Sequence, residues 1–167
     1  ELDLVKTLPS GHVRLDIRPE TNAGFVSRAA ADIEKAGKDL LPFFHLDNDT
    51  PDSFYLEALR NAQCDRIALV GCQDLKIVPA ERIDPLVNAI HDQFGNIPVA
   101  AGSDAFFTEF NRNRISAEKA DAFVFSINPQ VHAFDNLSIV ETLEGQEAVV
   151  KTALAICDGK PVWVSPV

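Results

Sequence analysis

Six short apolar runs recur along the chain without alternating with polar positions. This is the pattern of parallel strands that are buried on both faces. The runs cover residues 12–17, 40–46, 66–70, 97–101, 122–127 and 161–164. They begin about 30 residues apart, which is the length of a strand, a helix and their connections. The sequence therefore predicts consecutive βα units.

Helical periodicity fills most of the intervals between these runs. Apolar residues at the spacing i, i+3, i+4 predict helices within 25–33, 83–94 and 150–157. Thr50, Pro51 and Asp52 supply an N-cap, a proline at the first helical position and an acidic first turn for a further helix. Glycines follow three of the helical patterns, where helices often end in a left-handed residue: Gly37, Gly95 and Gly159.

Two α/β architectures fit this cycle, an open doubly wound sheet and part of a (β/α)8 barrel. A nucleotide-binding open sheet carries G-x-G-x-x-G or G-x-x-x-x-G-K-[ST] after a strand, and neither motif occurs in the sequence. Leu4, Val5 and Leu8 resemble the end of a preceding helix, and no helical pattern follows the last strand. We therefore expect residues 1–167 to form a single α/β domain, a partial (β/α)8 barrel of about six strands. It is expected to be a fragment of a larger barrel domain.

Composition narrows the function classes. The 167 residues include 15 Lys and Arg against 25 Asp and Glu, giving a net charge of −10, and 46% are hydrophobic. These values are typical of a globular domain rather than a disordered chain. The negative charge argues against a nucleic-acid partner, and no apolar run reaches the roughly 20 residues that span a membrane.

The cysteines and histidines indicate no metal or cofactor. Cys64, Cys72 and Cys157 form no C-x-x-C pair, so we expect free, buried thiols in a reducing, cytoplasmic compartment. The first residues contain no signal-peptide core. The four histidines are too scattered for a zinc site: His12, His45, His91 and His132.

In a parallel α/β fold, the segments that follow the carboxyl ends of the strands build the active site. We expect residues 102–114 to form a long loop, which contains two carboxylates, three aromatic residues and two arginines. Glu109 has two interpretations. It could act as a general acid or base near aromatic rings, or it could cap a helix or form a salt bridge. For Asp104, which follows Ser103, we expect a turn or a helix cap.

A second polar segment, Asn128 to His132, follows the fifth strand. The amides of Asn128 and Gln130 suit recognition of hydroxyl groups, and His132 could act as an acid or base near neutral pH. The alternative is a proline-fixed turn whose amides bind the loop backbone, with His132 as a surface residue.

Three further polar residues lie at the ends of the first two strands. His45 is more often a satisfied core residue in such a position than a ligand. For Asp16 and Arg18, the simplest interpretation is an ion pair, either with each other or across the barrel.

Three segments resemble the D-apionate lactonase family: SDAFFTEFNRNR at 103–114, FSINPQVHAFD at 125–135 and ETLEGQ at 141–146. This family comprises multidomain bacterial enzymes of branched-sugar (apiose) catabolism with a glycosidase-like TIM barrel. The resemblance extends from residue 2 to residue 167 as the middle of that barrel. It implies hydrolysis of a small sugar lactone, D-apionolactone, to D-apionate.

The resemblance also suggests roles for residues in the polar loops. Glu109 or His132 would act as the base or acid, and Arg112 or Arg18 would face the developing negative charge. The remaining candidates would contact the substrate: Asp16, His45, Asn111, Asn128 and Gln130. A carboxylate from a barrel strand outside this chain could also be essential, and the fragment alone would then be inactive.

Two alternatives stay open at this point. In a glycoside hydrolase of the TIM-barrel type, Glu109 would pair with a second carboxylate about 5 Å away, or about 6.5–9.5 Å away in an inverting enzyme. In a non-catalytic sugar-binding domain, the polar loops would bind without turnover. In either case, the exposed barrel edges of a six-stranded piece predict self-association.

Overall fold

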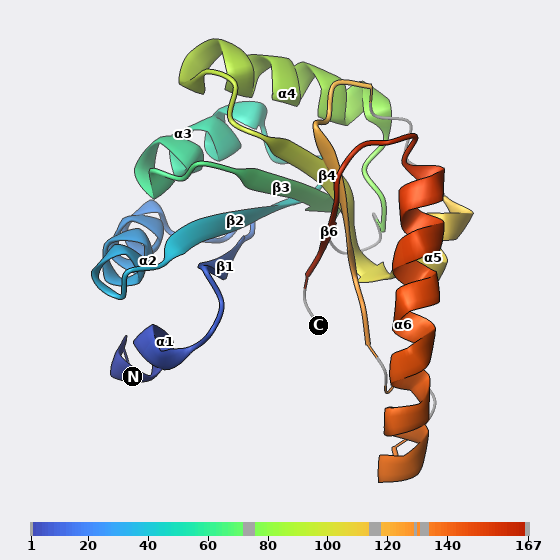
Figure 1. The fold of residues 1–167 in the computed structure, drawn as a ribbon. Coiled ribbons are helices and arrows are strands. Elements are labelled where there is room, and N and C mark those ends of the chain that lie inside the picture. Colours follow the sequence, from blue (N-terminus) through green and yellow to red (C-terminus); the bar gives the residue numbers. More distant parts are fainter. Residues whose placement is uncertain (1, 72–75, 114–117, 129, 131–133, 166–167) are drawn as a thin grey trace.

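A computed structural model describes residues 2–71, 76–113, 118–128, 130 and 134–165. Helices and strands alternate in the order α1 (Leu2–Thr7), β1 (His12–Ile17), α2 (Ala23–Lys35), β2 (Asp39–Leu46), α3 (Asp52–Ala62), β3 (Ile67–Gly71), α4 (Ala80–Phe94), β4 (Val99–Phe106), α5 (Phe107–Arg112), β5 (Ala122–Ser126), α6 (Asn136–Ile156) and β6 (Val162–Val164). The six strands form one sheet in chain order, and all neighbouring strands are parallel (Figure 1). The sheet curls, which confirms the predicted α/β partial barrel.

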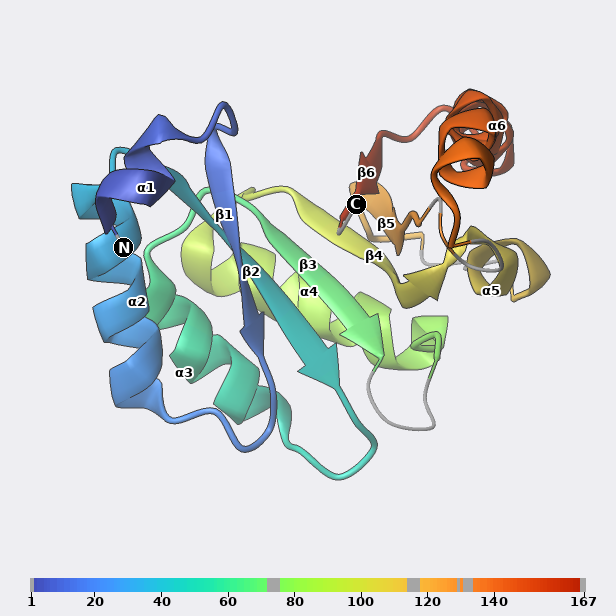
Figure 2. The same cartoon turned by 90° about the horizontal axis from the view of Figure 1, so that it is seen from below.

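Helices α2 to α6 cover the outer face of the curl in two groups (Figures 1 and 2). Helices α2, α3 and α4 pack on β1 to β4 through a large apolar core that includes Val26, Tyr55 and Leu86. A separate core under α5 and α6 joins Phe110 and Ala153 to the outer side of β5. The inward-facing side chains of the sheet form a third cluster.

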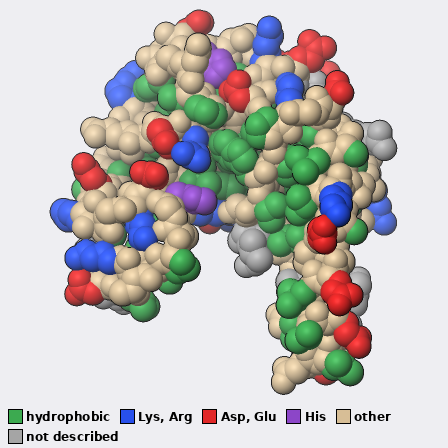
Figure 3. Space-filling view, in the orientation of Figure 1, with side chains coloured by type: hydrophobic (Ala, Val, Ile, Leu, Met, Phe, Trp, Pro, Cys, Tyr) green, Lys and Arg blue, Asp and Glu red, His purple; other side chains and the backbone are tan. Residues whose placement is uncertain are grey.

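This inner cluster consists mainly of small and aliphatic residues together with one aromatic ring: Leu41, Phe43, Ala68, Val70, Ala100, Ala122 and Val124. Hydrophobic side chains gather in the hollow of the curl (Figure 3). Since side chains of a strand alternate between its two faces, the same strands supply both the inner cluster and the outer cores. This explains the continuous apolar runs in the sequence.

Strand β4 differs most from the prediction. It was expected at 97–101 but spans Val99–Phe106, with a register irregularity between Gly102 and Phe106 where it pairs with β5. Ser103 is buried, and its hydroxyl donates to the Lys76 carbonyl at 2.8 Å and accepts from the Ala105 N–H. These bonds satisfy a polar residue inside the sheet, so the strand continues beyond the apolar run.

Other boundaries were predicted more closely. Gly37, Gly95 and Gly159 all have positive φ, which confirms the expected helix ends. The N-cap prediction for Thr50 was wrong by one residue, since α3 begins at Asp52 and its N-cap is Pro51, which has no side-chain donor or acceptor.

The environments of two cysteines can be described. Cys157 is buried in the core under α6, and Cys64 packs partly buried against the core under α2 to α4. Both are free thiols, as expected, whereas Cys72 lies outside the described residues.

Strands β1 and β6 form the edges of the sheet. Self-association through these edges stays a prediction. On α6, several large apolar side chains are exposed: Leu137, Val140, Leu143 and Leu154. In the part of the chain that the structure describes, no helix combines the length and the hydrophobicity that crossing a membrane requires.

Candidate functional site

Charged side chains project from β1 into the hollow of the sheet. Val13, Leu15 and Ile17 pack outward against the core under α2 to α4, so the alternating residues Arg14 and Asp16 face inward. The Arg14 guanidinium lies 3.9 Å from the centre of the Phe43 ring, which belongs to the inner cluster. The ring holds the cation against an otherwise apolar surface.

Arg14 joins two aspartates from distant strands. Its Nε and Nη2 donate to Asp16 Oδ1 at 2.9 and 2.6 Å, and Nη2 also donates to Asp104 Oδ1 at 2.6 Å. Since β2 and β3 separate β1 from β4 in the sheet, the Arg14–Asp104 bond crosses the hollow. The ion pair expected for Asp16 and Arg18 is not formed between them, because Asp16 pairs with Arg14 on its own strand. The pair that crosses the hollow joins Arg14 to Asp104, and neither residue was predicted to form it.

Asp104 contradicts the prediction of a turn or helix cap. It lies within β4 with its side chain 33% exposed, and its backbone carbonyl accepts a hydrogen bond from the Ser126 hydroxyl at 3.2 Å. The extension of β4 beyond residue 101 carries Asp104 into reach of Arg14. A cap role would have required a helix that begins directly after it, but α5 begins at Phe107.

His45 contacts Asp16 and is buried, with only 1% of its surface exposed. Its Nε2 is 2.8 Å from Asp16 Oδ1, and its Nδ1 is 3.3 Å from Arg18 Nη1. Because a guanidinium only donates, Nδ1 accepts and the Nε2–H donates to Asp16, which assigns the tautomer. His45 is thus a satisfied buried residue, as the simpler interpretation of the sequence expected.

The surroundings of Asp16 keep it ionised. Burial favours the neutral carboxyl group, but hydrogen bonds from His45 and Arg14, together with the Arg14 charge, outweigh it and lower the pKa of Asp16 to about 2. A carboxylate with so low a pKa is a poor proton acceptor near neutral pH and a good acceptor of hydrogen bonds.

Glu109 occupies a different position from the one expected. The predicted loop over 102–114 is wrong for its described part, because 102–106 continues β4 and 107–112 forms the short helix α5. The Glu109 side chain is 23% exposed and lies 3.6 Å from both Lys76 Nζ and Arg112 Nη1. Asn113 Nδ2 also donates to it at 3.2 Å. The salt-bridge alternative for Glu109 is therefore observed.

The other predicted residues are mostly exposed. Asn111 and Arg112 lie at the surface of α5. Asn128 Oδ1 accepts from the Gln130 backbone N–H at 2.8 Å, which matches the turn interpretation of this segment. His132 lies outside the described residues, so its predicted role stays a prediction.

The structure thus brings together Asp16, Arg18 and His45 from the predicted set, and adds Arg14 and Asp104. We call these five residues the hollow cluster. Asp16, Arg18, His45 and Asp104 lie at or near the carboxyl ends of β1, β2 and β4, where barrel active sites are built, and Arg14 reaches them from the middle of β1. The signal for Arg14 was its spacing of two from Asp16 on a strand whose alternate residues are apolar.

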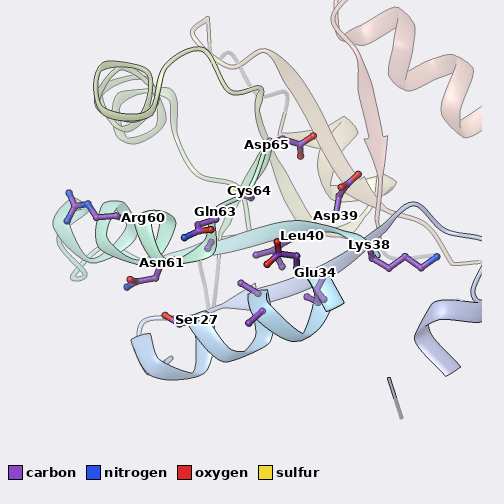
Figure 4. A pocket seen from close by; sticks show the side chains of 14 residues that line it. Ser27, Glu34, Lys38, Asp39, Leu40, Arg60, Asn61, Gln63, Cys64 and Asp65 are labelled. Atoms are coloured by element: carbon purple, nitrogen blue, oxygen red, sulfur yellow. The ribbon is translucent and has the colours of Figure 1, made fainter. Parts of the chain in front are cut away.

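A separate cavity of about 560 Å³ lies between α2 and α3 (Figure 4). Its lining includes Glu34, Lys38 and Asp39 near the start of β2, and Arg60 and Asp65 near the end of α3 and the start of β3. It therefore lies at the amino ends of the strands, the face of a barrel that serves stability rather than catalysis. Over the described stretches of the chain, no group of three or more His, Cys, Asp or Glu side chains is arranged to hold a metal ion.

Comparison with known proteins gives three findings. Phosphoribosyl anthranilate isomerase from Thermus thermophilus has 15% sequence identity and a TM-score of 0.46, covering 99% of this chain and 83% of that one. A D-apionate lactonase from Brucella anthropi is 31% identical over 84 residues, which are 50% of this chain and 14% of that protein. The family model for the D-apionate lactonase TIM barrel domain matches residues 56–167. Since this match spans more than half of the chain, the chain belongs to the D-apionate lactonase TIM barrel domain family.

Proposed function

We propose that this chain forms part of the catalytic barrel of a sugar lactonase that hydrolyses D-apionolactone to D-apionate. The observation that carries the proposal is the family match over residues 56–167, together with the similarity to a D-apionate lactonase. The hollow cluster supports it, because it places ionised and hydrogen-bonding groups at the end of the barrel where substrates bind.

The reaction requires a base, an oxyanion partner and groups that hold the ring. Water adds to the lactone carbonyl as a base takes its proton, and the ring C–O bond then breaks. The ring oxygen takes up a proton and becomes a hydroxyl group. The former carbonyl carbon becomes a carboxylic acid, which releases its proton to the solvent and ends as a carboxylate. Glu109 or His132 is proposed as the base or acid, and Arg18 or Arg112 as the cation facing the oxyanion.

The remaining predicted residues are proposed to bind the substrate. Asn111, Asn128 and Gln130 have amide groups that both donate to and accept from ring hydroxyls. The side chain of Asn111 lies at the surface of α5, on the same short helix as Glu109.

The proposal is tested by the release of acid from a panel of lactones, followed with a pH indicator in the full-length protein. The panel includes D-apionolactone and other aldonolactones. Aryl glycosides are tested separately, by the release of the phenol. Glu109→Gln and His132→Ala are compared with Glu57→Gln, a matched change on the exposed side of α3. Loss of a base or acid is expected to lower kcat by about 100-fold or more, while the control retains activity.

Each outcome separates the candidate functions. Turnover of D-apionolactone that collapses in either variant supports the lactonase and assigns the base. Cleavage of aryl glycosides with inert lactones would instead identify a glycoside hydrolase. Binding of sugars without any turnover would identify a binding domain and overturn the lactonase.

A further inference from the structure

The carboxylate of Asp16 uses one oxygen for all its internal bonds. Asp16 Oδ1 accepts from Arg14 Nε, Arg14 Nη2 and His45 Nε2 at 2.9, 2.6 and 2.8 Å. Among the described residues, Oδ2 accepts no hydrogen bond, although the side chain is only partly buried, with 41% of it exposed. One oxygen therefore anchors the group and the other is available to a ligand.

Asp104 is held in the same way. Its Oδ1 accepts from the same Arg14 Nη2 at 2.6 Å, and within the described part of the chain its Oδ2 has no protein donor. Because both carboxylates bind one nitrogen, they lie side by side although they come from β1 and β4. The pair thus presents two neighbouring acceptor oxygens in the hollow.

Arg14 gives up a hydrogen bond in this arrangement. Its Nη1 is fully buried and has no hydrogen-bond partner among the described residues. A buried N–H without an acceptor lowers the stability of the fold, because it loses its hydrogen bond to water. An ion pair between Arg14 and a single carboxylate would not require this loss. The position of Arg14 is explained if its function is to hold two carboxylates together.

We propose that Asp16 and Asp104 bind two adjacent hydroxyl groups of a polyhydroxylated aldonate or its lactone, with Arg14 and His45 as positioning residues. This inference rests on the proposed function, since it assigns the substrate class to the same site. Each free oxygen accepts one O–H, and a charged acceptor strengthens each of these hydrogen bonds. The low pKa of Asp16 supports this role, because the acceptor stays ionised throughout the neutral range.

The first experiment measures binding rather than turnover, by calorimetric titration of the full-length protein. The probes are D-apionate, which carries adjacent hydroxyls, and 4-hydroxybutanoate, which has the same main chain without them. Asp16→Asn is the main variant, because Asn keeps an acceptor for Arg14 and His45 and replaces the free oxygen by a donor. Asp104→Asn is the second variant, and Asp32→Asn, an exposed change on α2, is the matched control.

We expect the unchanged protein to prefer D-apionate by at least tenfold. Asp16→Asn and Asp104→Asn should each weaken D-apionate binding by about 10- to 100-fold and 4-hydroxybutanoate binding by less than threefold. Asp32→Asn should leave both affinities unchanged. Equal weakening of both ligands, or no preference in the unchanged protein, would overturn the inference and leave the cluster as a structural ion pair.

The role of His45 needs a separate pair of variants. His45→Leu removes the donor to Asp16, whereas His45→Gln retains an N–H that can replace it. We expect the preference for D-apionate to fall in His45→Leu and to be restored in part in His45→Gln. A preference unchanged by His45→Leu would contradict the positioning role.

Failure of this inference can be distinguished from failure of the lactonase proposal. If lactones are not hydrolysed but the preference for D-apionate depends on Asp16 and Asp104, the inference holds and the lactonase does not. If D-apionolactone is hydrolysed and both Asn variants retain wild-type KM, the lactonase holds and the inference does not.

Discussion

Replacement of Gly102 by alanine tests how closely β4 and β5 approach. A Cβ atom at Gly102 would lie 1.7 Å from the Val124 carbonyl oxygen and 2.6 Å from the Val124 carbonyl carbon. Both atoms belong to the backbone of β5, so no side-chain rotation relieves the clash and the strands must separate. Overpacking in a core typically costs about 1–3 kcal/mol, and each lost strand hydrogen bond adds about 1 kcal/mol. We therefore expect Gly102→Ala to destabilise the fold by about 3 kcal/mol or more.

The assay is thermal and urea-induced unfolding, with Gly145→Ala as the matched control. Gly145 lies inside α6, and a Cβ there meets no atom within 4 Å. Alanine at this position should stabilise the helix by about 1 kcal/mol. The same substitution thus has opposite signs at the two sites, and Gly102→Ala should lower Tm by about 6–12 °C. A change below 1 kcal/mol at Gly102 would refute the close approach of β4 and β5.

Two further predictions concern titrating groups. The pKa of Asp16 falls from 3.8 to about 2 on folding. Its ionised form therefore adds to the free energy of unfolding above pH 4, and this stabilisation is lost as the pH falls from 3.8 to 2. After allowance for solvent screening, we expect the stabilisation to be about 1 kcal/mol. Urea unfolding between pH 2 and 5 measures the free energy of unfolding of the unchanged protein and of Asp16→Asn. The difference between the two free energies should shrink toward pH 2, and a difference that grows would contradict the lowered pKa of Asp16. Burial raises the pKa of Cys64 to about 12 and of Cys157 to about 11. In a Cys72→Ser variant at pH 8, both thiols should react with a disulfide reagent at least about 100-fold more slowly than free cysteine until the protein unfolds, and rapid reaction of either in the folded state would be inconsistent with its burial.

The strands were predictable because strands of a parallel sheet are buried on both faces and give unbroken apolar runs. Strand β4 shows the limit of this signal. Ser103 and Asp104 interrupt the apolar run, but one is satisfied by Lys76 and Ala105 and the other by Arg14. Lys76 lies 27 positions from Ser103 and Arg14 lies 90 positions from Asp104, so a local pattern cannot reveal these two partners.

The site was less predictable for the same reason. Asp16 and His45 were singled out as polar residues at strand ends, and the structure brings them into contact. For Arg14 the local signal is its spacing of two from Asp16, whereas its bond to Asp104 spans 90 positions and leaves no trace in the local pattern. The sequence predicts a loop around Glu109 because α5, with 6 residues, is too short to give a helical periodicity.

The Arg14–Asp104 bond has a further consequence for cooperativity. Each strand of this sheet pairs only with its neighbours in the chain, so the fold resembles a linear array in which stability passes from one unit to the next. A bond between the first and fourth strands adds a connection that skips two units and closes a long loop of chain. We therefore expect that fraying of β1 costs the interaction with β4, so that the first four strands unfold together.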